Sequence, residues 1–136
     1  MMKLLIKNAL ILTVNQNNEV LENADIAVED GRIQSLGKVP EKFQADKVID
    51  ATHQIALPGL VNAHTHIPMS LFRNYADDLP FWPWLLEKFK PVEDHLSAEH
   101  VYWGAKLGVL ELIQSGVTCF SDMYFYMDDV AKVVKE

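Results

Sequence analysis

The chain has 136 residues, of which 49% are hydrophobic and 23% charged, so it is long and apolar enough for a globular domain with a core and is unlike a disordered chain. Its 12 basic and 19 acidic residues give a net charge of −7, which argues against nucleic acid or an anionic membrane as a main partner. The single cysteine, Cys119, excludes an internal disulfide framework and fits a reducing cytoplasm.

Residues 3–56 predict short strands joined by tight turns. The apolar runs that we expect to be strands are 4–6, 10–12, 24–29, 32–36, 48–50 and 54–57. Asp30 and Gly31 predict a hairpin turn between two of these strands. His53 also lies in this part, and we expect it in a surface turn rather than at a ligand position.

The apolar start of the chain raises the question of targeting. Lys7 and Asn8 interrupt the apolar run, and no small-residue cleavage site follows, so we expect no secretory signal. No stretch approaches the roughly 18 uncharged apolar residues that a membrane span needs. We therefore expect a cytoplasmic protein that does not enter a membrane.

From residue 58 onward, predicted strands alternate with predicted helices. A strand is predicted over residues 60–66, and a helical segment over 81–89 that ends before Pro91. A long helix is predicted over 98–115, with Ser97 as its N-cap. A second strand covers 117–121, and a last helix starts at 128. This alternation is typical of a parallel β/α architecture. A complete eight-fold barrel takes roughly 250 residues, so this part has room for only two β/α units, and we expect the chain to be a fragment of a longer protein.

Two further expectations concern burial in this second part. The long helix is apolar on most faces, which predicts that it is heavily buried, and Gly104 and Gly108 share one face and would permit close packing on a sheet. Cys119 lies in the apolar run 117–120, so we expect it to be a small buried core residue rather than a nucleophile or a ligand.

Two histidines stand at the end of the strand that opens the second part. Because strand side chains alternate between faces, His64 and His66 are predicted to project from the same side. Neutral imidazole is the commonest nitrogen ligand for zinc-like ions. The pair therefore predicts half of a metal site.

The surrounding residues resemble a known family. The stretch 57–66 (LPGLVNAHTH) is similar to the first barrel strand of the amidohydrolase superfamily, in which paired histidines bind the catalytic metal. The stretches that resemble the methylthioadenosine/S-adenosylhomocysteine deaminase branch are 67–73 (IPMSLFR), 76–79 (ADDL), 84–85 (WL) and 91–94 (PVED). The chlorohydrolase and guanine deaminase branches are close relatives, and the resemblance runs from about residue 4 to the end.

This resemblance implies a fold and a domain arrangement. Residues 1–56 would be the N-terminal portion of a composite β-sandwich, and residues 57–136 the first two β/α units of an incomplete metal-dependent (β/α)8 TIM-like barrel. The active site of such a barrel lies at the carboxyl ends of its strands, where His64 and His66 fall.

The resemblance also implies the metal chemistry. His64 and His66 would bind one divalent metal ion, zinc or alternatively iron, which lowers the pKa of a bound water so that hydroxide displaces ammonia from the purine. In this family the remaining ligands are two histidines and an aspartate from later strands, with a glutamate as proton shuttle. None of those positions exists here, so we expect no catalytic residue within this chain.

Trp84 and Glu93 are the candidate substrate-binding residues, because the resemblance places both where related deaminases contact the nucleoside. A carboxylate accepts the hydrogen bonds of a ribose hydroxyl pair, and an indole offers a flat apolar wall. Core packing for Trp84 and an exposed charge for Glu93 remain the alternatives. For Asp122, at the end of the second strand, we expect a capping or structural role, and His95 and His100 are too remote to be confident ligands.

Three functional hypotheses follow. The first is a metal-dependent hydrolytic deaminase of adenine nucleosides such as 5′-methylthioadenosine and S-adenosylhomocysteine, a homo-oligomer whose partner is a small-molecule purine nucleoside and whose fragment is inactive alone. The second is a related amidohydrolase that acts on triazine or guanine-type rings. The third is a non-catalytic fragment that associates with itself through its unfinished barrel edge.

Overall fold

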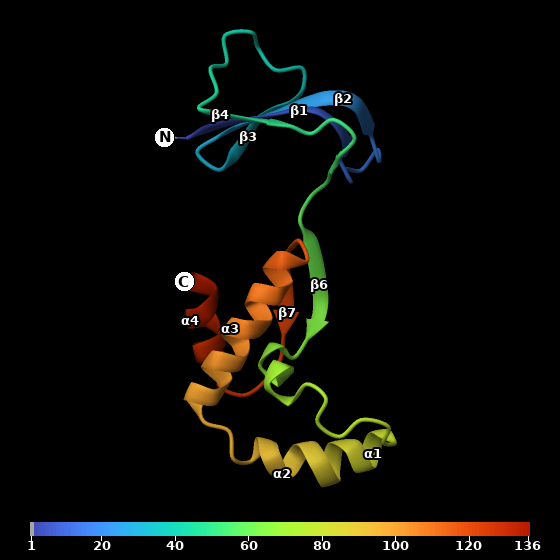
Figure 1. Ribbon diagram of the computed structural model, residues 1–136, viewed down its shortest axis with the longest axis vertical. Helices are drawn as coiled ribbons and strands as arrows, with labels where there is room; N and C mark the ends of the chain where they lie inside the picture. Colours follow the sequence, from blue (N-terminus) through green and yellow to red (C-terminus); the bar gives the residue numbers. More distant parts are fainter. Residues whose placement is uncertain (1) are drawn as a thin grey trace. The chain divides into compact units, whose positions relative to one another are not determined.

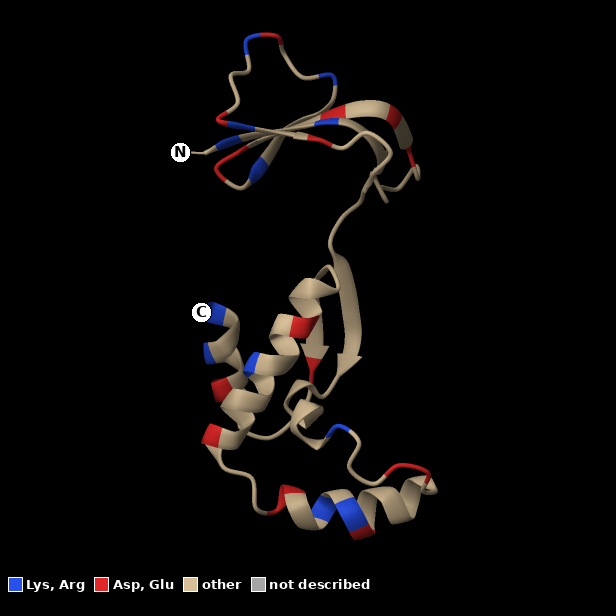
Figure 2. Cartoon of the chain, in the orientation of Figure 1, with Lys and Arg blue, Asp and Glu red and all other residues tan. Residues whose placement is uncertain are grey.

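The computed structural model describes residues 2–136 and forms two compact units that divide between Pro58 and Gly59. Figure 1 shows a β-sheet unit followed along the chain by a unit of parallel strands and helices. Charged residues of both signs are interspersed in each unit, whereas β6 carries none (Figure 2). Within the described residues, no helix has the length and apolar character that would let it cross a bilayer.

The first unit is a five-stranded sheet. Its strands are β1 (Lys3–Leu12), β2 (Val20–Glu29), β3 (Arg32–Gly37), β4 (Lys47–Asp50) and β5 (Ile55–Ala56). The order is β3-β2-β1-β4, with antiparallel pairing among the first three, while β4 and β5 both run parallel to β1. The buried residues of its core are Ala9, Ile11, Ala24, Ile26 and Ala51.

Two local features shape this sheet. The two predicted strands at 4–6 and 10–12 are one strand, interrupted at Asn8, where φ is +62° and the register with β2 shifts. Such a shift bends a strand without ending it. Asp30 and Gly31 have φ of +50° and +74°, so the predicted tight turn between β2 and β3 is confirmed.

The second unit is built on two parallel strands. β6 (Leu60–Thr65) pairs with β7 (Val117–Asp122), and between them come the 3₁₀ helix η1 (Ile67–Phe72), the segment Phe81–Glu93 and α3 (Ala98–Gln114). The last helix is α4 (Met127–Lys135). The buried core residues are Ile67, Val101, Ala105, Val130 and Val133, contributed by η1, α3 and α4.

The helical segment after the 74–80 loop continues past the proline that was predicted to end it. It comprises α1 (Phe81–Pro83), the π-helix η2 (Trp84–Phe89) and α2 (Lys90–Glu93). The Lys90 N–H bonds the Leu85 carbonyl, five residues back, so the turn before Pro91 is wide. Because a wider turn loosens the approach of the proline ring to the preceding carbonyls, the helix tolerates Pro91.

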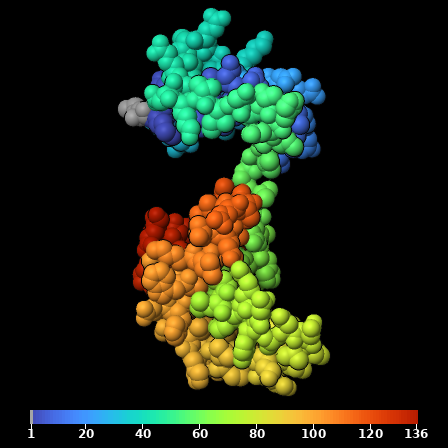
Figure 3. Space-filling view, viewed as in Figure 1, coloured from blue at the N-terminus to red at the C-terminus, as the bar shows by residue number. Residues whose placement is uncertain are grey.

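The expectation that α3 is heavily buried is wrong. Trp103, Leu110 and Ile113 are each more than half exposed, because the contacts of α3 with η1, α4 and β7 do not cover them. Gly104 and Gly108 lie on that face, but they pack against η1 rather than against a sheet. Figure 3 shows the yellow-green chain around η1 lying against the orange surface of α3.

The expectation that Cys119 is a buried core residue is also wrong, because its side chain is exposed. β7 pairs with β6 alone and α3 packs against it, so Cys119 points away from that packing while the neighbouring Phe120 joins the core. An apolar run therefore predicted the strand correctly but not which of its residues are covered.

Candidate metal centre

His64 and His66 are brought together at the carboxyl end of β6. Thr65 lies in register with Asp122 of the parallel strand β7, so both strands end at the same edge. The Nε2 atoms of the two histidines are 3.3 Å apart, and the rings meet edge to face with centroids 5.1 Å apart. Two ring nitrogens thus converge on one point.

The protonation of His66 follows from its partner. Its Nδ1 lies 2.6 Å from the carbonyl oxygen of Met123, and a carbonyl only accepts, so Nδ1 carries the hydrogen. The Nε2 atom then has a free lone pair directed at His64. A hydrogen bond from the second ring nitrogen to a carbonyl is the usual way in which a metal-binding histidine is held in place.

The separation of the two nitrogens fits a tetrahedral ion. Zinc–nitrogen bonds of about 2.0–2.1 Å at a tetrahedral angle place two nitrogens about 3.3 Å apart. The distance between the two Nε2 atoms in the structure is also 3.3 Å. In the absence of an ion, the same separation suits an N–H···N hydrogen bond, so ion binding requires His64 to carry its own proton on Nδ1.

Asp122 lies beside the histidines and has a structural role. Its carboxylate accepts from the N–H of Ile67 at 3.3 Å, which holds the first residue of η1 directly after His66. Burial raises the pKa of Asp122, while hydrogen bonds from the backbone of Ile67 and Met123 and the nearby His66 act in the opposite direction. An open hollow of about 170 Å³ is lined by Ala63, His64, Thr65, His66, Ser121, Asp122 and Met123.

Two side chains are too few to complete a site. Among residues 2–136, no group of three or more histidine, cysteine, aspartate or glutamate side chains is placed to hold an ion. A catalytic zinc takes about three protein ligands and keeps one position open.

Glu93 is linked to the same strand end by a residue that sequence reasoning missed. The hydroxyl of Tyr124, two residues beyond β7, donates to Oε1 of Glu93 at 2.7 Å. Burial, and then the bond to Glu93, raise the pKa of Tyr124, so the hydroxyl remains a donor. Nothing in the sequence distinguishes Tyr124 from Tyr126, because the pairing depends on where the segment Phe81–Glu93 packs.

Trp84 lies at the first residue of η2 and is half-buried. Its indole packs on Phe89 with centroids 4.3 Å apart and stacks on Phe81 at 6.0 Å. It also lines an open hollow of about 500 Å³ with Phe81 and the loop 76–79. These contacts support a packing role for Trp84, and part of its side chain also borders the hollow.

The remaining histidines have local roles. Ser97 is the N-cap of α3 as predicted: its side chain accepts from the N–H of His100, and the Nδ1 of His100 accepts from the N–H of Ser97 at 3.2 Å. His100 is therefore engaged in a reciprocal cap. His95 is exposed, and His53 stands in a turn with φ of +63° in the first unit.

Comparisons with known proteins identify the family of this chain. The model of the amidohydrolase family matches residues 55–136. The chain is 50% identical over 135 residues to a 5-methylthioadenosine/S-adenosylhomocysteine deaminase of Thermoanaerobacter pseudethanolicus, covering 99% of this chain and 31% of that protein. It is 47% identical over 135 residues to a 5′-deoxyadenosine deaminase of Methanosarcina barkeri, with coverage of 99% and 31%.

A solved structure is also similar to this chain. An adenosine deaminase of Xanthomonas campestris with bound zinc superposes with a TM-score of 0.90 at 35% identity, covering 98% of this chain and 31% of that one. The chain thus spans about a third of the length of these relatives. It belongs to the amidohydrolase family, and its fold is that of the N-terminal part of an amidohydrolase barrel preceded by part of a small β-domain.

Proposed function

We propose that His64 and His66 are two ligands of a single divalent metal ion, zinc or alternatively iron, in a hydrolase that deaminates adenine nucleosides such as 5′-methylthioadenosine and S-adenosylhomocysteine. The observation that carries this proposal is the pair of Nε2 atoms 3.3 Å apart at a strand end. The relatives named as adenine-nucleoside deaminases and the neighbour with bound zinc support it.

The proposal assigns a task to the residues around the histidine pair. A bound ion supplies Lewis-acid activation of the water that replaces the exocyclic amine of the purine. The carbonyl of Met123 fixes the tautomer and orientation of His66, so that the lone pair of its Nε2 can serve as a ligand. Asp122 holds the backbone that follows His66 and keeps the strand end in register.

Glu93 and Trp84 would contact the nucleoside. The carboxylate of Glu93 accepts hydrogen bonds from the 2′- and 3′-hydroxyls of the ribose, which are two adjacent donors. The part of the Trp84 indole that borders the hollow would serve as an apolar wall for the nucleoside. Burial of Trp84 against Phe89 supports this role, because a rigid wall costs little entropy on binding.

The proposal includes the arrangement of the whole protein. Residues 1–56 would be part of a composite β-sandwich, and residues 57–136 the first two units of a barrel whose later strands bring the other ligands and the proton shuttle. The protein would act in the cytoplasm as a homo-oligomer. Exposed apolar side chains, among them Val61, Trp82 and Ile113, support further protein contacts on this unit.

The test uses the complete protein that carries this chain, loaded with metal. Ammonia release is measured from 5′-methylthioadenosine, S-adenosylhomocysteine, guanine and an aminotriazine, in the wild type and in Glu93→Ala. We expect the nucleosides to be deaminated, and Glu93→Ala to raise their KM by about 10- to 100-fold, as expected for lost charge-assisted hydrogen bonds. Metal content should not change.

Two outcomes would contradict the proposal. One is hydrolysis of the sugar-free rings with no turnover of the nucleosides, which would favour a ring hydrolase. The other is nucleoside deamination with an unchanged KM in Glu93→Ala. That result would contradict the role of Glu93 in ribose binding but not the roles of His64 and His66 as metal ligands.

A further inference from the structure

One short loop contacts both His66 of the histidine pair and Glu93, the candidate substrate-binding carboxylate. The loop between β7 and α4 gives the carbonyl of Met123 to Nδ1 of His66 at 2.6 Å. The next residue, Tyr124, donates its hydroxyl to Glu93 at 2.7 Å. Two residues further on, the hydroxyl of Tyr126 donates to the carbonyl of Leu96 at 3.2 Å.

Tyr124 is the best supported of these contacts. Its ring packs against the core of the second unit and lies 6.5 Å from the ring of His66, centroid to centroid. Both Tyr124 and Glu93 are half-buried, so water competes less for their hydrogen bond than it would at the surface. A phenol and a carboxylate form a short, charge-assisted bond of this kind.

This bond restricts Glu93, the candidate side chain for ribose recognition. Glu93 is the last residue of the short helix α2, and a glutamate side chain in that position has several rotamers. The Tyr124 hydroxyl occupies one lone pair of Oε1 and leaves Oε2 and the other lone pair of Oε1 free. A carboxylate held in this way still has enough acceptors for two hydroxyl groups.

We propose that Tyr124 is a positioning residue, which holds the Glu93 carboxylate for the ribose diol from the same loop that orients His66. This inference rests on the proposed nucleoside deaminase function and adds to it the residue that sets recognition of the sugar. Tyr124 does not touch the substrate. It fixes the rotamer of Glu93 before binding, so that the nucleoside does not bear the entropic cost of ordering it.

The experiment compares two substrates in the complete, metal-loaded protein. They are 5′-methylthioadenosine and its 2′,3′-dideoxy analogue, which lacks the diol. In Tyr124→Phe we expect KM for the first to rise roughly 10-fold, the factor for one charge-assisted hydrogen bond. KM for the dideoxy analogue, kcat and metal content should stay at their wild-type values.

Two further variants make the result specific. In a Glu93→Ala background, Tyr124→Phe should have no additional effect on KM, because the residue through which it acts is gone. Tyr102→Phe is the matched control, since Tyr102 donates to the carboxylate of Glu136 at 3.0 Å on the α3–α4 side of the unit. We expect this control to leave both KM values unchanged.

Because each variant is compared on two substrates, partial loss of folded protein cancels from the comparison. The inference is overturned if Tyr124→Phe affects both substrates equally, adds to Glu93→Ala, or has no effect while the wild type deaminates the nucleoside. If the wild type deaminates no adenine nucleoside, the proposed function itself fails, and that result is visible before any variant is made.

Discussion

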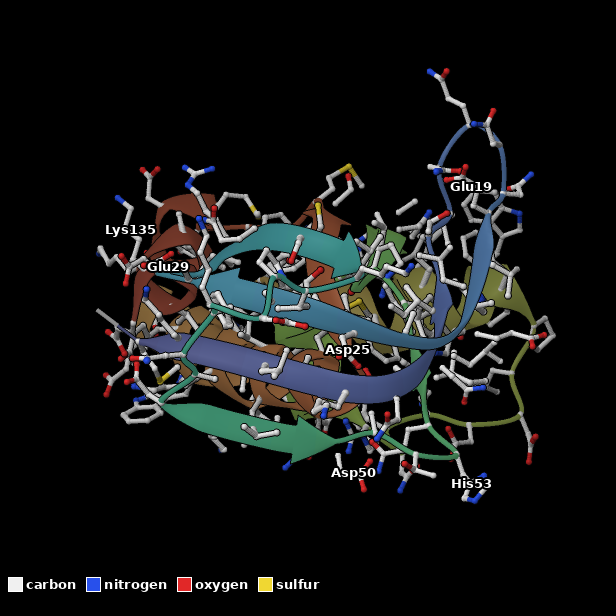
Figure 4. All side chains as sticks on the ribbon, turned by 90° about the horizontal axis from the view of Figure 1, so that it is seen from above. Glu19, Asp25, Glu29, Asp50, His53 and Lys135 are labelled. Carbon is white, nitrogen blue, oxygen red and sulfur yellow. The ribbon has the colours of Figure 1, made fainter. Side chains whose placement is uncertain are left out.

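Each unit has a cluster of polar side chains at the end of a strand, and the two clusters differ in what they leave unpaired. In the first unit, Asp50 at the end of β4 accepts from Asn8 at 3.1 Å and from the hydroxyl of Thr52 at 2.6 Å. The backbone N–H of Asn8 donates in turn to Asp25 at 3.0 Å. Figure 4 shows Asp50 and His53 along the β4 side of the sheet, with Asp25 on the other side of β1.

The cluster at the end of β6 is not closed in this way. His66 donates outward to a carbonyl, and its second nitrogen faces the equivalent nitrogen of His64. In the first cluster, the carboxylates of Asp25 and Asp50 accept hydrogen bonds from neighbouring amide and hydroxyl groups. These bonds stabilise the bend in β1 at Asn8. The two converging Nε2 atoms can share one hydrogen when no ion is bound, and the proposed function replaces that hydrogen with a metal ion. Residue type alone does not separate these cases, because both clusters include polar residues in turns.

The largest effect should follow from breaking the second cluster. In the complete protein, His64→Ala should release the metal and lower kcat/KM by more than about 100-fold, beyond the 10- to 100-fold typical of groups that only support a ligand. Metal content by mass spectrometry and nucleoside deamination measure the two effects. His53→Asn is the matched control, because asparagine tolerates the positive φ of that turn.

The comparison between the clusters depends on this pair of variants. Equal metal content in His64→Ala and in the wild type would show that the converging nitrogens do not bind the ion. Loss of metal in His53→Asn would show that the first unit, too, contributes to the site. We expect neither result.

A smaller effect should come from the close packing of Gly104 in α3 against η1, the helix that follows His66. A Cβ at Gly104 would lie 2.6 Å from the carbonyl oxygen of Pro68 and 2.8 Å from Leu71, in the 3₁₀ helix that follows His66. Glycine to alanine normally stabilises a helix by about 1 kcal/mol. Gly104→Ala should instead destabilise the chain by about 1–3 kcal/mol, the cost of overpacking.

Chemical denaturation of the chain measures this free energy of unfolding. Gly108→Ala should behave similarly, because its Cβ would lie 2.5 Å from Ile67. A gain in stability in both variants would show that η1 moves away at little cost. It would also show that η1, which follows His66, is not held rigidly by α3.

The sequence predicted the elements better than their burial. The Asp30–Gly31 turn and the Ser97 cap follow from short-range patterns, and the structure confirms them. The predicted strands also occur, although those at 4–6 and 10–12 are one strand. Cys119 and the outer face of α3 were assigned to a core because they are apolar. Burial depends on what packs against an element, and local periodicity does not report that.

The site shows the same division. The same-side projection of His64 and His66 follows from strand alternation, and their 3.3 Å approach agrees with it. The contacts of Met123 and Tyr124 could not be predicted, because they join positions 57 and 31 residues apart in sequence. Their roles, like those of Trp84 and Glu93, remain predictions.

The smallest effect concerns the closed cluster of the first unit. The hydrogen bond from the Thr52 side chain, followed by that from Asn8, lowers the pKa of Asp50 below its ordinary value. A carboxyl group with a lower pKa in the folded state contributes stability above its unfolded pKa, about 3.9, and loses it as the pH falls through the folded value. Asp50→Asn should therefore reduce the difference in melting temperature between pH 6 and pH 3.

Thr52→Val provides a graded comparison for this prediction, since it removes the strongest donor but keeps the carboxylate and the backbone N–H of residue 52. Its acid dependence should fall between those of the wild type and Asp50→Asn. Thermal unfolding of the chain at the two pH values measures all three proteins. If Asp50→Asn keeps the full acid dependence of the wild type, the hydrogen bonds around Asp50 do not stabilise its ionised form. The contrast between this cluster and the pair of His64 and His66 would then fail.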